Sequence, residues 1–110
     1  MDSSNDLVKL ELYKSGMMKF AEGDFEGALE VFARAIELDP RYADVYQSMA
    51  HCHEKLGDLD AALRCAQQAV EYNPDDFLAH TSLSIFYQRK GMIAEAEQEK
   101  ALAAQLQSKQ

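Results

Sequence analysis

The chain has 110 residues, 47% of them hydrophobic, which is typical of one small domain with a single core. Its 19 acidic side chains against 11 basic ones give a net charge of −8, which repels nucleic-acid backbones and anionic membrane surfaces. Neither nucleic acid nor membrane is therefore expected as a partner. The first residues lack the basic flank and apolar stretch of a secretory signal, and no apolar run approaches the ~20 residues of a membrane helix, so we expect a soluble, cytoplasmic protein.

The first predicted element is a helix from about residue 5 to residue 21. Ser4 or Asn5 serves as its N-cap, which leaves residues 1–4 as a short flexible N-terminus. The helix ends at Gly23, because glycine readily adopts the left-handed conformation of a C-cap.

The same pattern of turn residues recurs along the rest of the chain. Asp24 can cap a second helix, and Asp39-Pro40 ends it because proline disfavours helical geometry in the residue before it. The later glycines and the second proline divide the chain in the same way. The remaining helices are therefore predicted over 25–38, 42–56, 59–72, 76–90 and 93–107.

The chain repeats itself every 34 residues. This shift superposes the three glycines at 23, 57 and 91, and it also superposes the small residues Ala28, Ala62 and Ala96. A methyl group at that position lets the two helices of a pair approach closely, so a bulky replacement would overpack the crossing. A period of 34 residues with two helices is typical of the tetratricopeptide class.

Over residues 6–107 the chain resembles the tetratricopeptide repeat family. The second repeat carries the family pattern best, with Tyr46, Met49, Ala50, Ala62, Ala69 and Pro74 in signature positions. The resemblance implies an all-α superhelix, a tetratricopeptide solenoid of six antiparallel helices that forms one domain over 1–110, with repeats at 9–42, 43–76 and 77–110. In the third repeat Lys100 replaces a large apolar residue, as expected for a terminal helix with one face in water.

Asp44, Ser48 and His51 share one predicted helix face and superficially supply a nucleophilic triad. A triad needs the histidine between the serine and the acid, whereas Ser48 lies in the middle here. Asp44 and His51 are also separated by about 10 Å of helix rise. We therefore predict that the protein is not an enzyme.

A metal site is the second chemical interpretation that we considered, from His51, His53, His80 and the only two cysteines, Cys52 and Cys65. Adjacent helical residues point about 100° apart, so His51 and His53 face nearly opposite ways and cannot share a tetrahedral site. No paired-cysteine spacing and no phosphate-cradling glycine motif accompanies them. We expect reduced, partly buried thiols, packing or groove histidines, and neither metal nor cofactor.

The family resemblance implies that the first helix of each pair lines a concave groove for an extended peptide or a helix of a partner protein. Both ends of this groove are expected to be apolar and its middle polar and titratable, which suits a ligand of mixed character. The predicted lining is Leu10, Tyr13, Lys14, Met17, Phe20 and Ala21, then Asp44, Gln47, Ser48, His51, Glu54 and Lys55, then Leu78, Thr81, Ser82, Ile85, Gln88 and Arg89.

Co-chaperones of this family grip acidic chaperone tails with a carboxylate clamp of lysine, arginine and asparagine side chains. The five clamp positions are occupied here by Tyr13, Met17, Ser48, Leu78 and Ser82, none of which is a cation. We therefore predict a protein-interaction module, with a scaffold or adaptor role, that works without this clamp.

A second interpretation is self-assembly, in which the outer faces of the terminal helices dock end to end and give a weak homo-oligomer. The sequence leaves open whether the groove or the terminal faces form the binding site.

Overall fold

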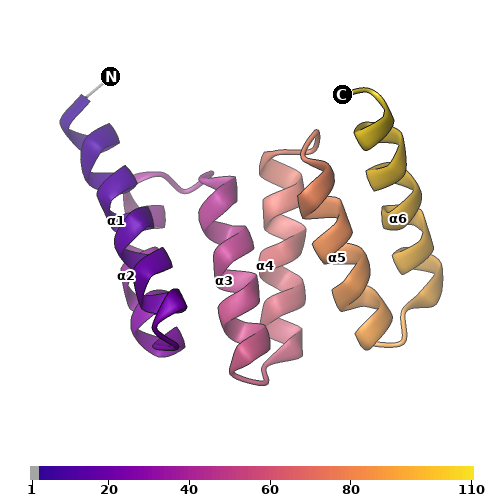
Figure 1. The fold of residues 1–110 in the computed structure, drawn as a ribbon, viewed down its shortest axis with the longest axis horizontal. Coiled ribbons are helices and arrows are strands. Elements are labelled where there is room, and N and C mark those ends of the chain that lie inside the picture. Colours follow the sequence, from indigo (N-terminus) through magenta and orange to yellow (C-terminus); the bar gives the residue numbers. More distant parts are fainter. Residues whose placement is uncertain (1–2) are drawn as a thin grey trace.

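The computed structural model describes residues 3–110, and these residues form six α-helices in three antiparallel pairs (Figure 1). No strand occurs within 3–110. The all-α arrangement of six antiparallel helices predicted from the repeat is therefore confirmed. The helices are α1 (Ser3–Ala21), α2 (Phe25–Leu38), α3 (Ala43–Lys55), α4 (Leu59–Tyr72), α5 (Phe77–Arg89) and α6 (Ile93–Ser108).

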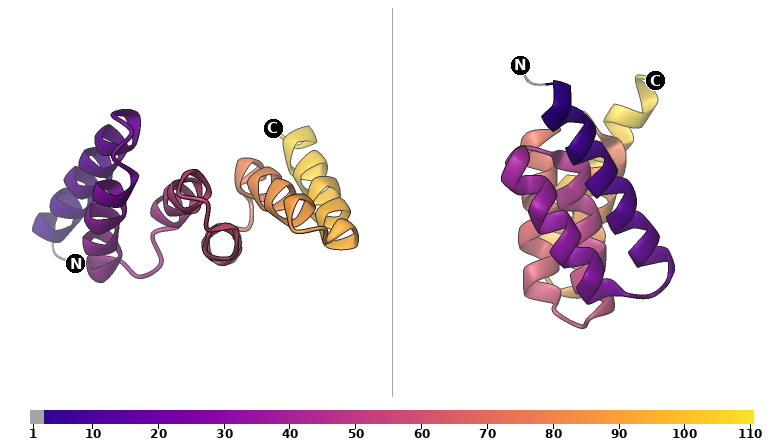
Figure 2. Two further views of the ribbon diagram at one scale, coloured as in Figure 1. Left: turned by 90° about the horizontal axis from the view of Figure 1, so that it is seen from below. Right: turned by 90° about the vertical axis from the view of Figure 1, so that its left-hand side faces the viewer.

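The pairs are arranged in a row, with α1 at one end and α6 at the other (Figures 1 and 2). Each pair packs within itself, and successive pairs pack through α2 against α3 and through α4 against α5. The first helices α1 and α3 also touch directly. This arrangement places the predicted groove residues of α1, α3 and α5 on the same series of first helices.

Glycine and aspartate make the tight turn within the first two pairs. Gly23 and Gly57 both have φ of 85°, a left-handed conformation that suits glycine because it has no Cβ. The next residue then caps the second helix, since the Asp24 carboxylate accepts a hydrogen bond from the Gly27 amide at 2.9 Å. The turn and cap that the sequence predicts at Gly23-Asp24 are therefore confirmed.

The start of α1 differs from the prediction. The helix begins at Ser3, so Ser4 and Asn5 lie inside it and neither is the N-cap, while residues 3 and 4 are helical instead of flexible. The rest of the predicted flexible terminus, residues 1–2, lies outside the described part of the chain. All other predicted helix ends agree with the structure to within one residue.

Small residues allow the two helices of each pair to pack closely. Ala28 and Ala62 are completely buried and Ala96 is 3% exposed, as expected at a close helix crossing. In the first pair Gly16 has the same effect, because a Cβ at this position would lie 2.3 Å from the Phe32 ring. The largest buried side chain of the first pair therefore occupies the space that glycine leaves.

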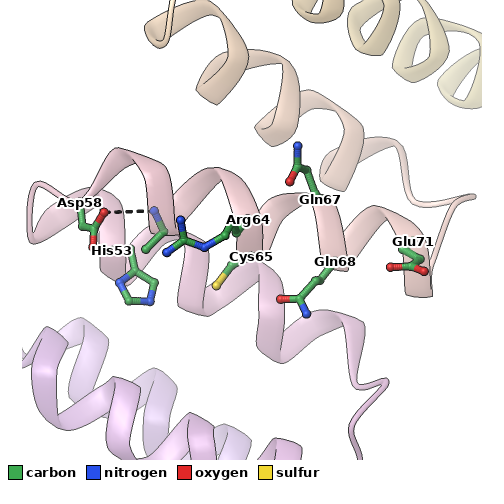
Figure 3. Close-up of a pocket in the computed structure, with 8 residues that line it drawn as sticks. His53, Asp58, Arg64, Cys65, Gln67, Gln68 and Glu71 are labelled. Carbon is green, nitrogen blue, oxygen red and sulfur yellow. Dashed lines mark hydrogen bonds between the residues drawn. The ribbon is translucent and has the colours of Figure 1, made fainter.

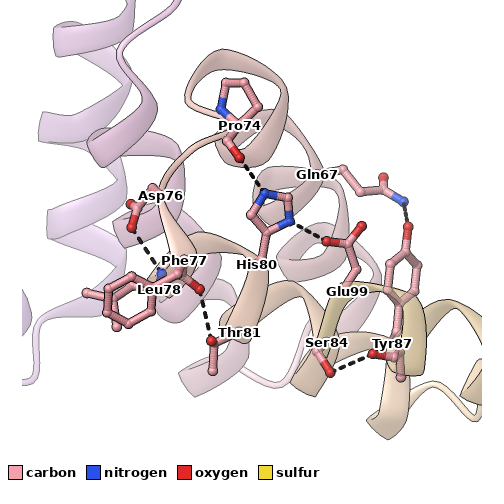
Figure 4. A network of polar contacts seen from close by, with 11 residues as sticks. Gln67, Pro74, Asp76, Phe77, Leu78, His80, Thr81, Ser84, Tyr87 and Glu99 are labelled. Carbon is pink, nitrogen blue, oxygen red and sulfur yellow. Dashed lines mark hydrogen bonds and ion pairs between the residues drawn. The ribbon is translucent and has the colours of Figure 1, made fainter. Parts of the chain in front are cut away.

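A buried histidine fastens the last helix pair together (Figure 4). The His80 side chain is 4% exposed; its Nε2 lies 2.7 Å from the Pro74 carbonyl oxygen and its Nδ1 lies 2.5 Å from Glu99 Oε2. Beside it the Ser84 hydroxyl donates to the Ala96 carbonyl oxygen at 2.9 Å. His80 is thus a packing histidine, the simpler of the two interpretations that the sequence offered.

We expect Ala62→Leu to destabilise the protein by roughly 1–3 kcal/mol, because the added atoms overpack a crossing that has no free space. Lys100→Leu should leave stability nearly unchanged, since Lys100 is exposed on the outer side of α6. Urea denaturation followed by circular dichroism tests both variants. Equal shifts of the two midpoints would contradict the packing order described here.

Glu99→Ala should destabilise the fold by about 1–3 kcal/mol, because it leaves a ring nitrogen of His80 buried without a partner. Glu97→Ala, on an exposed position of the same helix, is the matched control. Amide hydrogen exchange measures the effect, which should appear first in α6. Equal protection of α6 in the two variants would show that the His80 contact does not hold this helix.

Candidate functional site

The predicted groove residues fall into three classes of exposure. The most accessible apolar groups are Leu78 and Ile85 of α5, which are 56% and 47% exposed, followed by Leu10 and Met17 of α1 at 40% and 39%. The half-buried members are Tyr13, Phe20, Gln47, Ser48, His51, Glu54 and Ser82. The exposed polar members and Ala21 complete the lining: Lys14, Ala21, Asp44, Lys55, Thr81, Gln88 and Arg89.

Predicted residues of α1 and α3 come together around a small cavity. Met17, Phe20, Ser48 and His51 line a space of about 90 Å³ between the two helices. The Ser48 hydroxyl donates a hydrogen bond to the Met17 sulfur at 3.3 Å, which links the helices at its edge. The cavity is therefore a mostly apolar recess with a hydroxyl and an imidazole on its wall.

Predicted residues of α3 and α5 are connected by a second set of contacts. The Arg89 guanidinium forms an ion pair with Glu54, and the other Glu54 oxygen lies 3.4 Å from His51 Nδ1. The His51 ring also packs against Phe86, with 5.8 Å between the ring centroids. Phe86 was not predicted as part of the site, because its helical position marks it only as a core residue.

Tyr13, which is predicted to line the groove, is partly held in the core. Its ring packs against Phe32 at 6.3 Å and against Tyr42 at 5.6 Å between centroids, so much of it belongs to the core. Phe20 is similarly held, since its ring contacts the edge of Phe25 at 5.2 Å. Truncating Tyr13 would therefore disturb the fold together with any binding surface.

A separate row of predicted groove residues lies along α5 and consists of Leu78, Thr81 and Ile85. Leu78 and Ile85 have high exposure, and the Thr81 hydroxyl donates to the Phe77 carbonyl oxygen of its own helix at 2.9 Å. Within residues 3–110, none of these three side chains makes a polar contact with α1 or α3. This row is therefore exposed to solvent.

The charges of the lining are mixed and only partly neutralised. Arg89 is occupied by Glu54, whereas Lys14 and Lys55 have no ion pair with any residue in the described part of the chain. The exposed Asp44 lies on the same lining. The lining therefore offers two isolated lysines and no bidentate guanidinium that is free for a carboxylate.

The side chains of the superficial triad are engaged separately. Ser48 bonds to Met17 and His51 contacts Glu54, so hydroxyl and imidazole do not pair. Among residues 3–110, no group of three or more His, Cys, Asp or Glu side chains lies close enough to hold a metal ion. Cys52 and Cys65 are buried free thiols, and burial raises the pKa of Cys52 to about 11 and also raises the pKa of Cys65.

A larger depression of about 640 Å³ lies on α4, outside the predicted groove (Figure 3). The sequence singled out only His53 and Cys65 from it, as candidates for a metal site. Asp58 at its edge is occupied as the N-cap of α4, accepting from the Ala61 amide at 3.1 Å. The full lining is His53, Asp58, Ala61, Arg64, Cys65, Gln67, Gln68 and Glu71. Its charges are mixed, and no feature of it selects a ligand.

The paired helices and the 34-residue period define a helical-repeat fold. The model of the tetratricopeptide repeat family matches residues 19–85, and the chain belongs to this family. The sequence-based identification of the family is therefore confirmed.

Similar proteins include the rice Protein SGT1 homolog, 35% identical over 81 residues, which are 74% of this chain and 20% of that protein. The Small glutamine-rich tetratricopeptide repeat-containing protein 2 of Mycosarcoma maydis is 30% identical over 95 residues, which are 86% of this chain and 27% of that protein. The chain thus spans only about a fifth to a quarter of these two relatives.

Solved structures share the fold. MamA superposes with a TM-score of 0.87 at 25% identity, covering 92% of this chain and 59% of that one. The second TPR of Spaghetti (RPAP3), solved with a bound HSP90 peptide, also has a TM-score of 0.87, at 20% identity, and covers 96% of this chain and 99% of that one. In the described residues, no helix is long and apolar enough to cross a membrane.

Tyr13→Ala should destabilise the protein by about 3 kcal/mol or more, as expected for an aromatic residue that packs on two other rings. Met17→Ala should change stability much less, because Met17 is 39% exposed. Thermal denaturation of the two variants tests this division between a packing residue and a groove residue. A Tyr13→Ala variant as stable as wild type would show that Tyr13 is not a packing residue.

Proposed function

We propose that the protein is an interaction module that binds a peptide or helix of a partner protein in the groove formed by α1, α3 and α5. The observation that carries the proposal is the apolar recess between α1 and α3 that Met17, Phe20, Ser48 and His51 line. Helix α3 is in turn linked to α5 by the ion pair of Glu54 with Arg89. The exposed Leu78 and Ile85 add apolar surface on α5. Such a lining suits a ligand with apolar side chains and a few hydrogen-bonding groups.

Recognition without the carboxylate clamp is part of this proposal. Three of the clamp positions carry side chains that cannot bind a carboxylate. They are occupied by the packed ring of Tyr13, the thioether of Met17 and the exposed aliphatic group of Leu78. The Arg89 guanidinium is held by Glu54 and is not free to clamp a terminal carboxylate. The ligand we propose therefore differs in chemistry from the HSP90 peptide bound by the second TPR of Spaghetti.

End-to-end self-assembly, in which the outer face of α6 docks on a terminal face of another copy, is the weaker alternative. Glu97 and Lys100 occupy positions that correspond, one repeat earlier, to Leu63 and Ala66 in the buried core beside α5. Docking of another solenoid on this face would bury both charges, which is unfavourable unless they are paired. The groove is therefore the surface that we assign to partner binding.

A cytoplasmic or other reducing compartment is the setting that we propose. Cys52 and Cys65 are free thiols in the folded protein, and neither needs an oxidising environment for its role in packing.

A peptide-display selection on the immobilised chain, followed by titration calorimetry, tests the groove. Met17→Ala and Ile85→Ala should each weaken binding of the selected peptide by roughly tenfold or more, because apolar anchors at an interface centre typically lose ~1–4 kcal/mol on truncation. Lys55→Ala should act mainly on the association rate and its salt dependence. Arg64→Ala, in the depression on α4, is the matched control and should have no effect.

Two outcomes would contradict the proposal in different ways. If Lys55→Ala has the largest effect at physiological salt, the ligand is acidic and the apolar anchors are secondary. If none of the groove variants changes affinity while Arg64→Ala does, the binding surface lies on α4.

A further inference from the structure

A row of four exposed side chains runs along the outer face of α1. Leu7, Glu11, Lys14 and Met18 are spaced by four, three and four residues, so they fall within about 60° of one another around the helix. Leu7 and Met18 are 63% and 65% exposed, more than any other large hydrophobic side chain among residues 3–110. We call these four residues the α1 stripe.

Two of the four stripe residues lie at positions that are completely buried in the second repeat. Glu11 and Met18 correspond, 34 residues on, to Val45 and Cys52 of α3, both of which are completely buried. That burial arises because α3 packs against α2, the second helix of the preceding pair. Since α1 is the first helix of the row, no helix of residues 3–110 covers its outer face (Figures 1 and 2).

The chemistry of the stripe is complementary to itself when one copy is reversed. Along α1 the order is apolar, acidic, basic and apolar. If two copies of α1 lie antiparallel about a two-fold axis, Leu7 meets Met18 of the other copy and Glu11 meets its Lys14. Neither Glu11 nor Lys14 has an ion pair within the described residues, so both charges are available for such contacts.

We propose that the α1 stripe is the interface at which two copies of this chain associate as a symmetric, antiparallel dimer. A second copy places an ammonium group opposite each Glu11, whereas the helix of a preceding solenoid pair, with an apolar inner face, would leave that carboxylate unpaired. Lys14 is the one stripe residue that also belongs to the predicted groove lining, whereas the groove residues of α3 and α5 remain open in the dimer, so a failure of the groove proposal leaves the dimer proposal standing. A single pair of helices buries little surface, so we expect a weak dissociation constant, on the order of 100 μM.

Analytical ultracentrifugation of the full chain over a concentration series tests the dimer with charge-reversed variants. Glu11→Lys places two lysines opposite each other at both symmetric contacts, and Lys14→Glu does the same with two glutamates. Each single variant should weaken association at least tenfold. The double variant Glu11→Lys with Lys14→Glu recreates both pairs in reversed order and should associate like wild type.

Matched controls on α6 separate this interface from end-to-end docking. Glu97→Lys and Lys100→Glu make the same changes in charge on the opposite end of the solenoid and should leave the dimer unchanged. A protein that stays monomeric up to about 1 mM would overturn the proposal. Association that is lost with the α6 variants, or that the double α1 variant fails to restore, would assign the interface to another surface.

Cross-linking determines the direction of the two helices. Under oxidising conditions, a mixture of Leu7→Cys and Met18→Cys chains should form a disulfide between unlike chains, while each variant alone should not cross-link. The buried Cys52 and Cys65 thiols are present in every sample, so any cross-linking through them is the same in all of them. A disulfide formed by Leu7→Cys alone would indicate a parallel arrangement and contradict the antiparallel dimer.

Discussion

The close crossing of the two helices within each pair is the constraint on which the remaining structure depends. Ala28, Ala62 and Ala96 keep that crossing narrow, and the stacking of one pair on the next follows from it because only narrow pairs present a continuous apolar side to their neighbours. The uncovered side of the first helices, where we propose that a partner binds, is a consequence of the same geometry. When second helices pack against following first helices, the first helices are left with one side uncovered.

Local sequence signals were sufficient for the fold because they recur three times at one spacing. The turn at Gly23-Asp24 needs a left-handed residue and then a cap, and these requirements are satisfied by residues adjacent in the chain. The same reliance on local signals led to a wrong prediction for the start of α1. Ser4 and Asn5 are good caps in isolation, but the helix extends past both of them to Ser3.

Side-chain contacts between repeats were beyond the reach of pattern analysis. Periodicity placed Tyr13 on the groove face, yet only the packed structure shows its ring against Phe32 and Tyr42. The pairing of His80 with Glu99 joins residues 19 positions apart in different helices. Nothing in the sequence spacing distinguishes such a packing histidine from a histidine that binds a metal. Helical projection thus predicts which face a residue occupies, while its partners depend on how two helices are rotated against each other.

The space that Gly16 leaves for Phe32 has a consequence for how the three repeats can vary. The corresponding residues are Ala50 with Ala66 in the second repeat and Ser84 with Lys100 in the third. A very small residue on one helix is thus matched to a large ring on the other only in the first repeat. The repeats are consequently not interchangeable modules, and a graft between them must carry both members of such a pair. A substitution at either position is constrained by the volume of the side chain at the other, so the residues at the two positions are expected to change together.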